Sequence, residues 1–395
     1  MDFYTLKDFD FSGKIVLVRV DFNVPLDKKG RITDDKRIRE SIPTIKHLMK
    51  QGARVVLASH LGKPKGVDES LRMNTIAKQL EKLLKHPVIK VDDCIGAEVE
   101  DEINETTPAE VVLLENLRFH EGEEKNDRLF AMALADLADF YVNDAFGSSH
   151  RNHASVVGVA EFLPSCAGFL LEKEIKELSR LFSPKTPFYA FMGGAKISDK
   201  INIVESLAKK ADKVLLGGAM IFTFYKALGY EVGKSLFEKD KLGLAKAVLK
   251  KYHSKIVLPE DVVVANTVAS NAKTKVVPMH GIPKGWQGVD IGPKTLMHYS
   301  DLAKRAKTIF WNGPMGIFEI KKFSKGTIGL AKAVASAKAL TIIGGGDSAS
   351  AIEQAKLQNK ITHLSTGGGA ALEFIEQETL PGIEALKKNK DKYCL

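Results

Sequence analysis

Short apolar runs and amphipathic segments alternate along the whole chain. The apolar runs are rich in Val, Ile, Leu and Phe, as buried strands are, and they lie at 14–24, 53–60, 87–92, 110–116, 140–146, 187–194, 213–218, 255–265, 308–313 and 339–346. Between them, apolar residues recur at helical spacing at 34–52, 73–85, 127–138, 198–211 and 326–337. Buried strands that alternate with helices predict an α/β protein with parallel sheets covered on both faces.

The length of the chain indicates more than one domain. A single hydrophobic core rarely serves 395 residues, so we expect two domains of roughly 150–200 residues each. Residues 168–187 read as one long amphipathic helix closed by a proline-containing turn, which makes this segment the candidate bridge. The sequence therefore predicts two Rossmann-like, doubly wound parallel-sheet domains with a cleft between them.

The residues that follow the predicted strands differ between the two halves of the chain. In the first half they are basic or polar: Asp21, Asn23, His60, Lys63, Arg118, His150, Arg151 and His153. In the second half they are glycine loops, at 193–196, 217–219, 312–314, 344–346 and 367–369. Guanidinium forks grip small anions, whereas glycine-loop amides grip nucleotide phosphates. Because ligands of doubly wound sheets bind at strand carboxyl ends, we expect one domain for a small phosphorylated acid and one for a nucleotide.

The loop Gly344–Ser350, "GGGDSAS", fits the G-x-G-x-x-A pattern of a dinucleotide site. That pattern also needs a carboxylate about 20 residues later for the ribose hydroxyl, where this chain has another glycine loop. A carboxylate inside the loop, Asp347, would repel a bare pyrophosphate but suits a phosphate-bound Mg²⁺. The alternative is a plain strand-to-helix turn without a ligand.

The segment "GGAKISDKI" at 193–201 resembles a phosphate loop but lacks the Walker A pattern, which occurs nowhere in the chain. Lys196 and Lys200 lie four residues apart and are predicted on one face at a helix start. Two cations are unfavourable there unless an anion is bound. A solvated lysine face is the alternative.

Composition narrows the class of protein. The chain carries 58 Lys+Arg against 49 Asp+Glu, a net charge of +9, but its lysines are scattered and no nucleic-acid signature appears. No apolar stretch approaches the ~18 residues of a membrane span. The three cysteines show no C-x-x-C spacing and support neither a disulfide framework nor a zinc site. A cytoplasmic enzyme without nucleic-acid or membrane partners is expected.

Eleven long sequence motifs are similar to those of a known protein family. They are "RVDFNVP" (19–25), "ASHLGKPKG" (58–66), "LLENLRFHEGEEKND" (113–127), "NDAFGSSHR" (143–151), "GGAKISDKI" (193–201), "LLGGAM" (215–220), "GWQGVDIGPKT" (285–295), "WNGPMGIFE" (311–319), "GGGDS" (344–348), "STGGGA" (365–370) and "LPGIEAL" (380–386). In this order, over essentially the whole chain, they resemble phosphoglycerate kinase.

The resemblance implies roles for matching positions. The 3-phosphoglycerate side would be bound by Asp21, Phe22, Asn23, Arg37, His60, Leu61, Gly62, Lys63, Arg118 and Arg151, with Arg19 and His153 adding to the basic patch. ADP or ATP would be held by Lys200, Gly217, Gly218, Gly288, Asn312, Glu319, Gly344, Gly345, Gly346, Asp347 and Ser348, with Asp347 on Mg²⁺. Catalytic roles would fall to Arg37, Lys196, Gly345 and Gly368. Lys63 stands where many members have Arg, and Ser348 where Thr is usual.

The implied activity is reversible transfer of the acyl phosphate of 1,3-bisphosphoglycerate to MgADP, giving 3-phosphoglycerate and MgATP. The implied enzyme is a monomeric phosphotransferase with a carboxyl acceptor, which closes the cleft between its domains for the reaction. The implied division is 1–168 for 3-phosphoglycerate, 169–185 as the interdomain helix, 186–375 for the nucleotide, and 376–395 returning to the first domain. Two other classes stay open: a dehydrogenase built on the glycine loops, and a non-catalytic anion or nucleic-acid binding protein that uses the positive charge.

Overall fold

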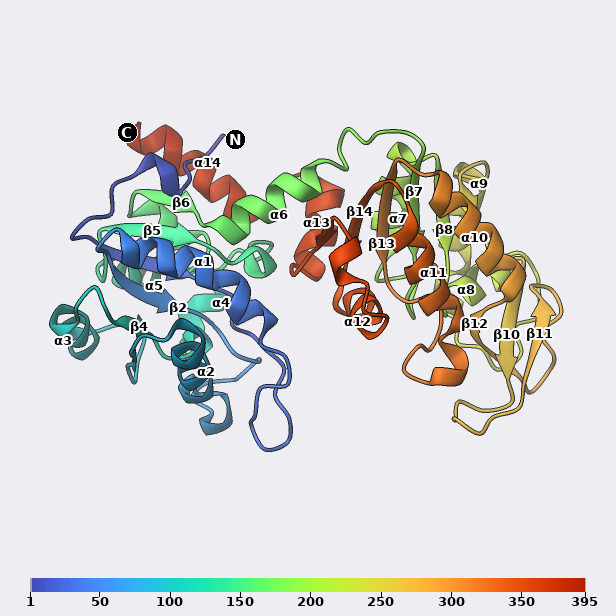
Figure 1. The fold of residues 1–395 in the computed structure, drawn as a ribbon, viewed down its shortest axis with the longest axis horizontal. Coiled ribbons are helices and arrows are strands. Elements are labelled where there is room, and N and C mark those ends of the chain that lie inside the picture. Colours follow the sequence, from blue (N-terminus) through green and yellow to red (C-terminus); the bar gives the residue numbers. More distant parts are fainter. Residues whose placement is uncertain (1, 395) are drawn as a thin grey trace. The chain divides into compact units, whose positions relative to one another are not determined.

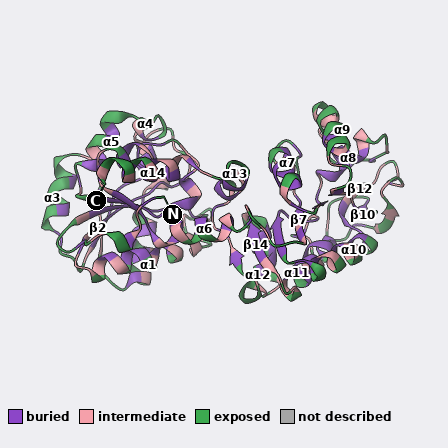
Figure 2. Cartoon of the chain, turned by 90° about the horizontal axis from the view of Figure 1, so that it is seen from above, coloured by how far each residue is buried: buried purple, intermediate pink, exposed green. Residues whose placement is uncertain are grey.

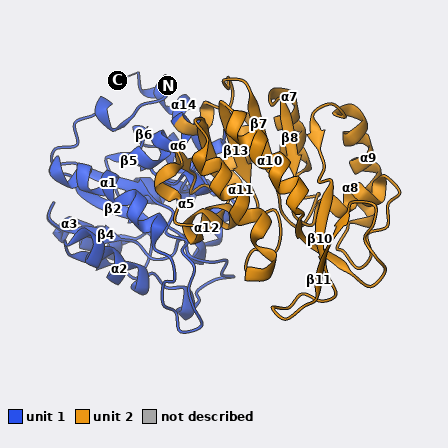
Figure 3. Cartoon of the chain, turned by 45° about the vertical axis from the view of Figure 1, so that its right-hand side comes forward, with its two compact units in different colours: residues 1–176, 379–395 blue, residues 177–378 orange. Residues whose placement is uncertain are grey.

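The computed structural model describes residues 2–394. The chain forms two compact units, residues 1–176 with 379–395 and residues 177–378, drawn in two colours in Figure 3. The C-terminal segment thus packs with the first unit although it follows the second in sequence. Each unit is built around its own sheet.

The first unit contains a six-stranded sheet in the order β3-β4-β2-β1-β5-β6, with every pair of neighbours parallel. Its strands are β1 Ile15–Arg19, β2 Arg54–Ala58, β3 Val88–Lys90, β4 Val111–Leu113, β5 Phe140–Asn143 and β6 Ser165–Ala167. Most strand residues are buried, because helices cover the sheet (Figures 1 and 2). The order reverses at β1, which pairs with β2 on one side and β5 on the other.

Helices and short 3₁₀ turns connect these strands. They are α1 Lys36–Lys50, α2 Asn74–Leu84, α3 Ala97–Glu105, α4 Glu121–Glu124, α5 Arg128–Ala135, α6 Phe169–Ser179 and α14 Pro381–Tyr393, with η1 Leu6–Asp8, η2 Glu69–Leu71, η3 Leu117–Phe119, η4 Phe146–Ser148 and η5 Gly158–Glu161. The buried residues of α1 include Ile38, Ile45 and Leu48, at the helical spacing that the sequence predicted.

The side chain of Asn389 ties helix α14 to the chain around β6. The amide Nδ2 of Asn389 donates to the carbonyls of Ala160 (2.6 Å) and Leu163 (2.7 Å), and its Oδ1 accepts from the backbone N–H of Ser165 (2.9 Å). Asn389 is buried. These bonds satisfy backbone groups beside β6, which explains why the end of the chain docks there.

The second unit has a six-stranded parallel sheet in the order β15-β14-β13-β7-β8-β9. Its strands are β7 Phe188–Met192, β8 Lys213–Leu216, β9 Ile256–Val257, β13 Thr308–Asn312, β14 Leu340–Gly344 and β15 His363–Leu364. The helices are α7 Ile201–Lys210, α8 Ile221–Ala227, α9 Leu242–Lys251, α10 Pro293–Arg305, α11 Lys325–Ser336, α12 Gly346–Gln354 and α13 Gly369–Gln377, with η6 Lys239–Lys241, η7 Lys321–Phe323 and η8 Gln358–Lys360. Here the order reverses between β7 and β13. The predicted fold class, two doubly wound parallel sheets, is confirmed.

One element of the second unit was not expected. The run 255–265 divides into β9 and a separate strand β10, Asp261–Ala265, which joins β11 (Thr274–Pro278) and β12 (Gln287–Ile291) in an antiparallel sheet. Pro259 lies between the two strands and has no N–H to continue a ladder. The antiparallel sheet has its own small core of Ala265, Ala272, Val289 and Phe323.

One helix boundary also differs from the sequence analysis. Helix α6 ends at Ser179, so 180–187 is not helical. Within residues 2–394, no helix combines the length and the apolar character needed to cross a membrane.

Candidate active site

The first unit gathers basic side chains where its strand order reverses. Arg19 ends β1, and the chain then continues through Asp21 and Asn23; His60 follows β2. Because strand carboxyl ends at a switch point form the ligand crevice of a doubly wound sheet, this edge is the candidate anion site of the unit.

Arg37, near the start of α1, is held by the segment that leaves β1. Its Nη1 donates to both carboxylate oxygens of Asp21, each at 2.9 Å, and to the carbonyl of Asn23 at 3.2 Å. The Oδ1 of Asn23 in turn accepts from the N–H of Gly62 at 2.9 Å. The Arg37 side chain stays 32% exposed. It is therefore fixed at one nitrogen and open to solvent elsewhere.

His60 is buried among guanidinium groups. The Nη2 of Arg19 donates to its Nδ1 at 3.1 Å. Burial lowers the pKa of His60 well below its ordinary value, and the charges of Arg19, Arg118, Arg151 and Arg37 lower it further. Because the imidazole is neutral and the four surrounding guanidinium groups are cations, the positive charge at this site favours an anionic ligand.

Arg118 lies on η3, and Asn116 positions it. The Oδ1 of Asn116 accepts from the N–H groups of Leu61 and Arg118, both at 3.2 Å, which ties η3 to the loop after β2. The guanidinium donates from Nη1 to the carbonyl of Gly62 at 2.6 Å, and its Nε lies 3.1 Å from a carboxylate oxygen of Glu124.

The Arg118 guanidinium keeps unused donors. Its Nη2 is buried and has no partner among the described residues, whereas Nε is buried and has only the ion pair with Glu124. Burial lowers the pKa of Arg118, and the nearby Arg151 and Arg19 act in the same direction. A buried cation whose N–H groups lack hydrogen-bond acceptors raises the free energy of the folded protein. An oxyanion of a bound ligand would supply the missing acceptors.

Glu123 and Ser155 support this cluster from behind, and the sequence analysis missed both. The Oγ of Ser155 accepts from Nε of Arg19 at 2.8 Å and donates to buried Glu123 at 2.6 Å. Burial raises the pKa of Glu123, but the bond from His153, the charge of Arg19 and the bonds from Ser155 outweigh it and leave the pKa lowered. A negative charge thus stands behind Arg19. Glu123 and Ser155 are far apart in the sequence, and no motif there indicated that their side chains would be in contact.

In the second unit, the backbones after β7 and β13 touch. The N–H of Gly193 donates to the carbonyl of Asn312 at 2.8 Å. A Cβ on Gly193 would collide with the carbonyl of Pro314, and one on Gly218 would collide with backbone atoms of Gly194. Only glycine permits this approach of three strand-end loops.

The loop after β14 is anchored on the same side. The Nδ2 of Asn312 donates to the carbonyl of Gly344 at 2.8 Å, and the N–H of Gly313 donates to Oγ of Ser348 at 2.6 Å. Gly345 precedes α12 with φ of 88°, a left-handed conformation that favours glycine. The N-terminus of α12 is thereby fixed with exposed Asp347 in its first turn.

Lys200 completes this arrangement by contacting Asn312, to whose Oδ1 its Nζ donates. Burial lowers the pKa of Lys200 to about 8, although the negative charges of Asp347 and Asp199 oppose the shift. Lys196 is exposed and lies before α7, whereas Lys200 caps that helix. The two lysines therefore do not share a helical face, and that prediction was wrong: the chain between them forms a turn.

A cavity of about 250 Å³ lies beside these loops. Among the residues that line it are Gly218, Phe222, Gly288, Met315, Glu319 and Asp347. A Cβ on Gly288 would collide with the ring of Phe222. An apolar cavity with a few carboxylates and glycine backbones at its edge can take a flat ring and present a phosphate tail to the loops.

Asp290 also lines this cavity and was missed by the sequence analysis. It is buried, and it accepts from the N–H groups of Gly326 (2.6 Å) and Ile291 (2.9 Å). Burial raises its pKa to about 7. It joins β12 to the start of α11.

Comparison with known proteins identifies the relatives of this chain. The sequence profile "Phosphoglycerate kinase" matches residues 6–378. The chain belongs to the phosphoglycerate kinase family. Members of this family are phosphotransferases with a carboxyl acceptor, and the chain is assigned to that class of enzyme. The assignment replaces the dehydrogenase and the binding-protein alternatives.

Individual phosphoglycerate kinases match over nearly their full length. The enzyme of Dictyoglomus turgidum is 53% identical over 387 residues, 97% of this chain and 98% of its own, and that of Moorella thermoacetica is 52% identical with the same coverage. The structure of phosphoglycerate kinase from Coxiella burnetii superposes with a TM-score of 0.87 at 38% identity, over 98% of this chain and 99% of its own. That from Pyrococcus horikoshii gives 0.87 at 34% identity, over 99% and 100%.

The residues expected from the phosphoglycerate kinase motifs divide cleanly between the units. Those expected on the 3-phosphoglycerate side all lie in the first unit and those expected on the nucleotide in the second. Gly368, expected to be catalytic, precedes α13 with φ of 54°. Neither Lys196 nor Gly368 is among the residues that line the 250 Å³ cavity.

Proposed function

We propose that the chain catalyses reversible transfer of the acyl phosphate of 1,3-bisphosphoglycerate to MgADP, which yields 3-phosphoglycerate and MgATP. The observation that carries this proposal is the buried Arg118 guanidinium, whose Nη2 has no partner among the described residues, in a cluster of cations. Such a cluster suits a substrate with both a phosphate and a carboxylate. Family membership supports the same reaction.

On the substrate side, each residue group has a distinct task. Arg118, Arg151, His60 and Arg19 would bind the phosphate of 3-phosphoglycerate, where guanidinium groups bind bidentately. Asp21 holds only one nitrogen of Arg37, so the rest of the guanidinium is free to contact a ligand. We place this contact at the end of the substrate where the phosphoryl group is transferred. Asp21, Asn23 and the backbone of Phe22, Leu61 and Gly62 would fix the carbon skeleton, and exposed Lys63 would add charge at the rim.

On the nucleotide side, the cavity lined by Gly218, Gly288 and Phe222 would take the base and ribose, with Glu319 at its edge. The polyphosphate would run along Asn312, Lys200 and the Gly344–Ser348 loop to the N-terminus of α12, whose N–H groups and dipole favour an anion. Exposed Asp347 supplies the oxygen ligand that Mg²⁺ prefers, so it fits the metal. Bound Mg²⁺ would neutralise phosphate charge.

The chain's own residues would act by position and charge. The carboxylate leaving group of the acyl phosphate is already a weak base, so no general acid is required. Lys196 and Arg37 would neutralise the equatorial oxygens of the transferring phosphoryl group, and the N–H groups of Gly345 and Gly368 would donate to it. These contacts strengthen as charge spreads in the transition state, which is what raises kcat.

We also propose the division of labour along the chain. Residues 1–168 would bind 3-phosphoglycerate, 169–185 would connect the domains, 186–375 would bind the nucleotide, and 376–395 would return to the first domain. The reacting oxygen and phosphorus must come within about 3–3.5 Å, so the domains would close over both ligands. A cytoplasmic monomer is the proposed working form.

The direct test is an assay of the purified protein with 3-phosphoglycerate and MgATP, coupled to removal of 1,3-bisphosphoglycerate. Turnover that requires both substrates is the expected result. The Arg118→Met variant removes the guanidinium and keeps an unbranched side chain, and we expect it to raise the KM for 3-phosphoglycerate while leaving the Kd for MgATP unchanged. Absence of turnover in folded wild-type protein would overturn the proposal.

A further inference from the structure

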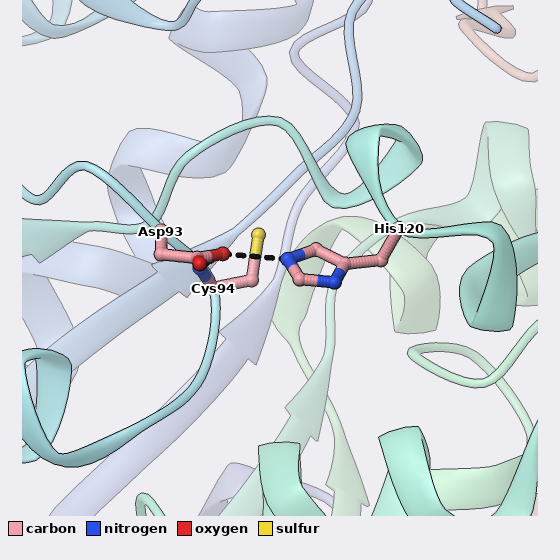
Figure 4. Close-up of side chains that lie close together, drawn as sticks. All are labelled: Asp93, Cys94 and His120. Atoms are coloured by element: carbon pink, nitrogen blue, oxygen red, sulfur yellow. Dashed lines mark hydrogen bonds and ion pairs between the residues drawn. The ribbon is translucent and has the colours of Figure 1, made fainter. Parts of the chain in front are cut away.

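Three side chains of different chemistry meet in the first unit, away from the basic cluster. Asp93 and Cys94 lie in the loop between β3 and α3, and His120 lies between η3 and α4 (Figure 4). One ligand atom from each, a carboxylate oxygen, Sγ and a ring nitrogen, lies within 4.8 Å of the other two. The proposed phosphoryl transfer uses none of the three.

The geometry of the three atoms is open on one side. The Nε2 of His120 and Oδ1 of Asp93 are 2.5 Å apart, and Figure 4 shows Sγ of Cys94 beside the line that joins them. The Asp93 side chain is 55% exposed and the His120 ring 30% exposed, whereas Cys94 is buried. Solvent therefore reaches the pair while the sulfur is fixed beneath it.

Neighbouring groups hold each member in place. The thiol of Cys94 donates to the carbonyl of Glu115 at 3.0 Å, and the N–H of Cys94 donates to Oδ1 of Asp93 at 2.6 Å. The His120 ring stacks on Phe130, with centroids 4.9 Å apart and planes inclined by 24°. The aromatic contact limits rotation of the imidazole, so its Nε2 stays aimed at Asp93.

We propose that Asp93, Cys94 and His120 form a binding site for a divalent transition metal of the zinc class. Zn²⁺ binds thiolate at about 2.3 Å and imidazole and carboxylate at about 2.0–2.2 Å in a tetrahedral arrangement. This set supplies one ligand of each kind and leaves the fourth position to water on the solvent side. Mg²⁺ and Ca²⁺ favour oxygen ligands and do not suit the thiolate.

Metal binding requires small movements and a proton change. Tetrahedral ligands of Zn²⁺ lie roughly 3.3–3.8 Å apart at these bond lengths, so the Asp93 and His120 atoms must separate, which their exposure permits. Cys94 must lose its thiol proton to solvent. The lone pair of Nε2 must be free, with the imidazole proton on Nδ1.

One of the three ligands, Asp93, also lines a largely acidic groove. The charged residues of this groove are Asp92, Asp93, Glu98, Asp101, Glu102 and Glu105, together with one cation, Lys90. Carboxylates on one wall raise the local concentration of cations. The groove and the three ligands share Asp93, and both favour a cation.

The test measures Co²⁺ binding to the untagged, full-length protein in the Cys394→Ser background, which removes the exposed thiol. A thiolate ligand gives near-ultraviolet charge-transfer absorption, and tetrahedral Co²⁺ gives visible bands. Both are expected at saturation with excess Mg²⁺ present. Cys94→Ser should abolish the ultraviolet band, and His120→Ala and Asp93→Asn should weaken binding about 10-fold or more. Asp136→Asn, at an exposed carboxylate outside the groove, is the matched control and should bind as the parent does.

A thermal unfolding measurement distinguishes a variant that has lost the metal site from one that has failed to fold. Zn²⁺ should raise the melting temperature of the parent and of Asp136→Asn, because a ligand that binds only the folded state stabilises it. Asp93→Asn, if folded by circular dichroism, should show a much smaller rise. No Co²⁺ bands in the parent, or bands that persist in Cys94→Ser, would overturn the proposal. Kinase activity is not needed for either readout, so failure here leaves the proposed reaction untouched.

Discussion

Arg19 donates a hydrogen bond from Nη2 to Nδ1 of His60, with 3.1 Å between the two atoms. Since a guanidinium can only donate, Nδ1 must accept, and the proton of the neutral imidazole therefore stays on Nε2. Protonation of Nδ1 would break this bond and place a positive charge among Arg19, Arg118, Arg151 and Arg37. The contact thus fixes both the tautomer and the charge of His60.

We expect His60 to make the fold less stable in acid. Burial and the four cations lower its pKa in the folded protein, so below about pH 6.5 the unfolded chain binds the proton more readily. Stability is then lost as pH falls, by up to about 1.4 kcal/mol per pH unit. In His60→Gln, the free energy of unfolding in urea should fall less steeply between pH 7 and pH 5.

The exposed His253 provides the control, as His253→Gln also removes an imidazole. Two-dimensional NMR of the His60 ring nitrogens gives a direct reading in wild type. A His60 ring that titrates at or above pH 6.5 would contradict the assignment.

Replacing Lys196 should slow the chemical step. Its ammonium is exposed beside the glycine loops, and we propose that it meets the transferring phosphoryl group only in the transition state. Lys196→Ala should lower kcat by roughly 10²–10³ with a smaller change in nucleotide KM. Lys209→Ala, an exposed lysine at the end of α7, is the matched control. A kcat within about threefold of wild type for Lys196→Ala would remove this residue from the mechanism.

Asp347 should matter only when the nucleotide carries its metal. A carboxylate in a phosphate loop repels a bare anion and is favourable once a cation lies between them. Asp347→Asn should therefore weaken MgADP binding, measured by calorimetry, while metal-free ADP binds as well as before or better. Equal losses with and without Mg²⁺ would indicate that Asp347 shapes the loop and does not bind the metal.

Nucleotide affinity should fall in alkaline solution because of Lys200. Burial lowers its pKa to about 8 in the free protein, and a bound polyphosphate would raise it again. At a pH between the pKa of Lys200 in the free protein and its higher pKa in the complex, Lys200 takes up a proton when the nucleotide binds. The Kd for MgADP should therefore increase as pH rises above about 8. Calorimetry at pH 9 in buffers with different ionisation enthalpies would show the uptake. Lys200→Met should bind weakly at every pH, and a wild-type Kd constant from pH 7.5 to 9.5 would refute the role.

Both substrates together should compact the molecule. The chain passes between the units at only two places, after Lys176 within α6 and after Glu378, and we expect bending near these segments, including 365–370 and 380–386. Small-angle scattering should show a smaller radius of gyration with 3-phosphoglycerate and MgATP than with either alone. An unchanged radius in protein that turns over would argue against closure.

Much of the architecture followed from the chain's pattern of side chains. Every apolar run became a strand or part of one, because a strand buried on both faces must be apolar along its length. The antiparallel sheet was missed because β11 is exposed or half-buried and gives no such run. The length of α6 and the start of α7 were mispredicted because periodicity continues past the point where a turn takes over.

The sequence by itself determined which residue types follow which strands, and this pattern predicts a small acid for one half of the chain and a phosphate chain for the other. Tertiary structure alone decided how those residues are held: Ser155 and Glu123 behind Arg19, Asn116 beneath Arg118, and Asp290 at the cavity. It also brought Asp93 and Cys94 to His120. These contacts join segments far apart in the chain, and only the packing of strands and helices sets such distances.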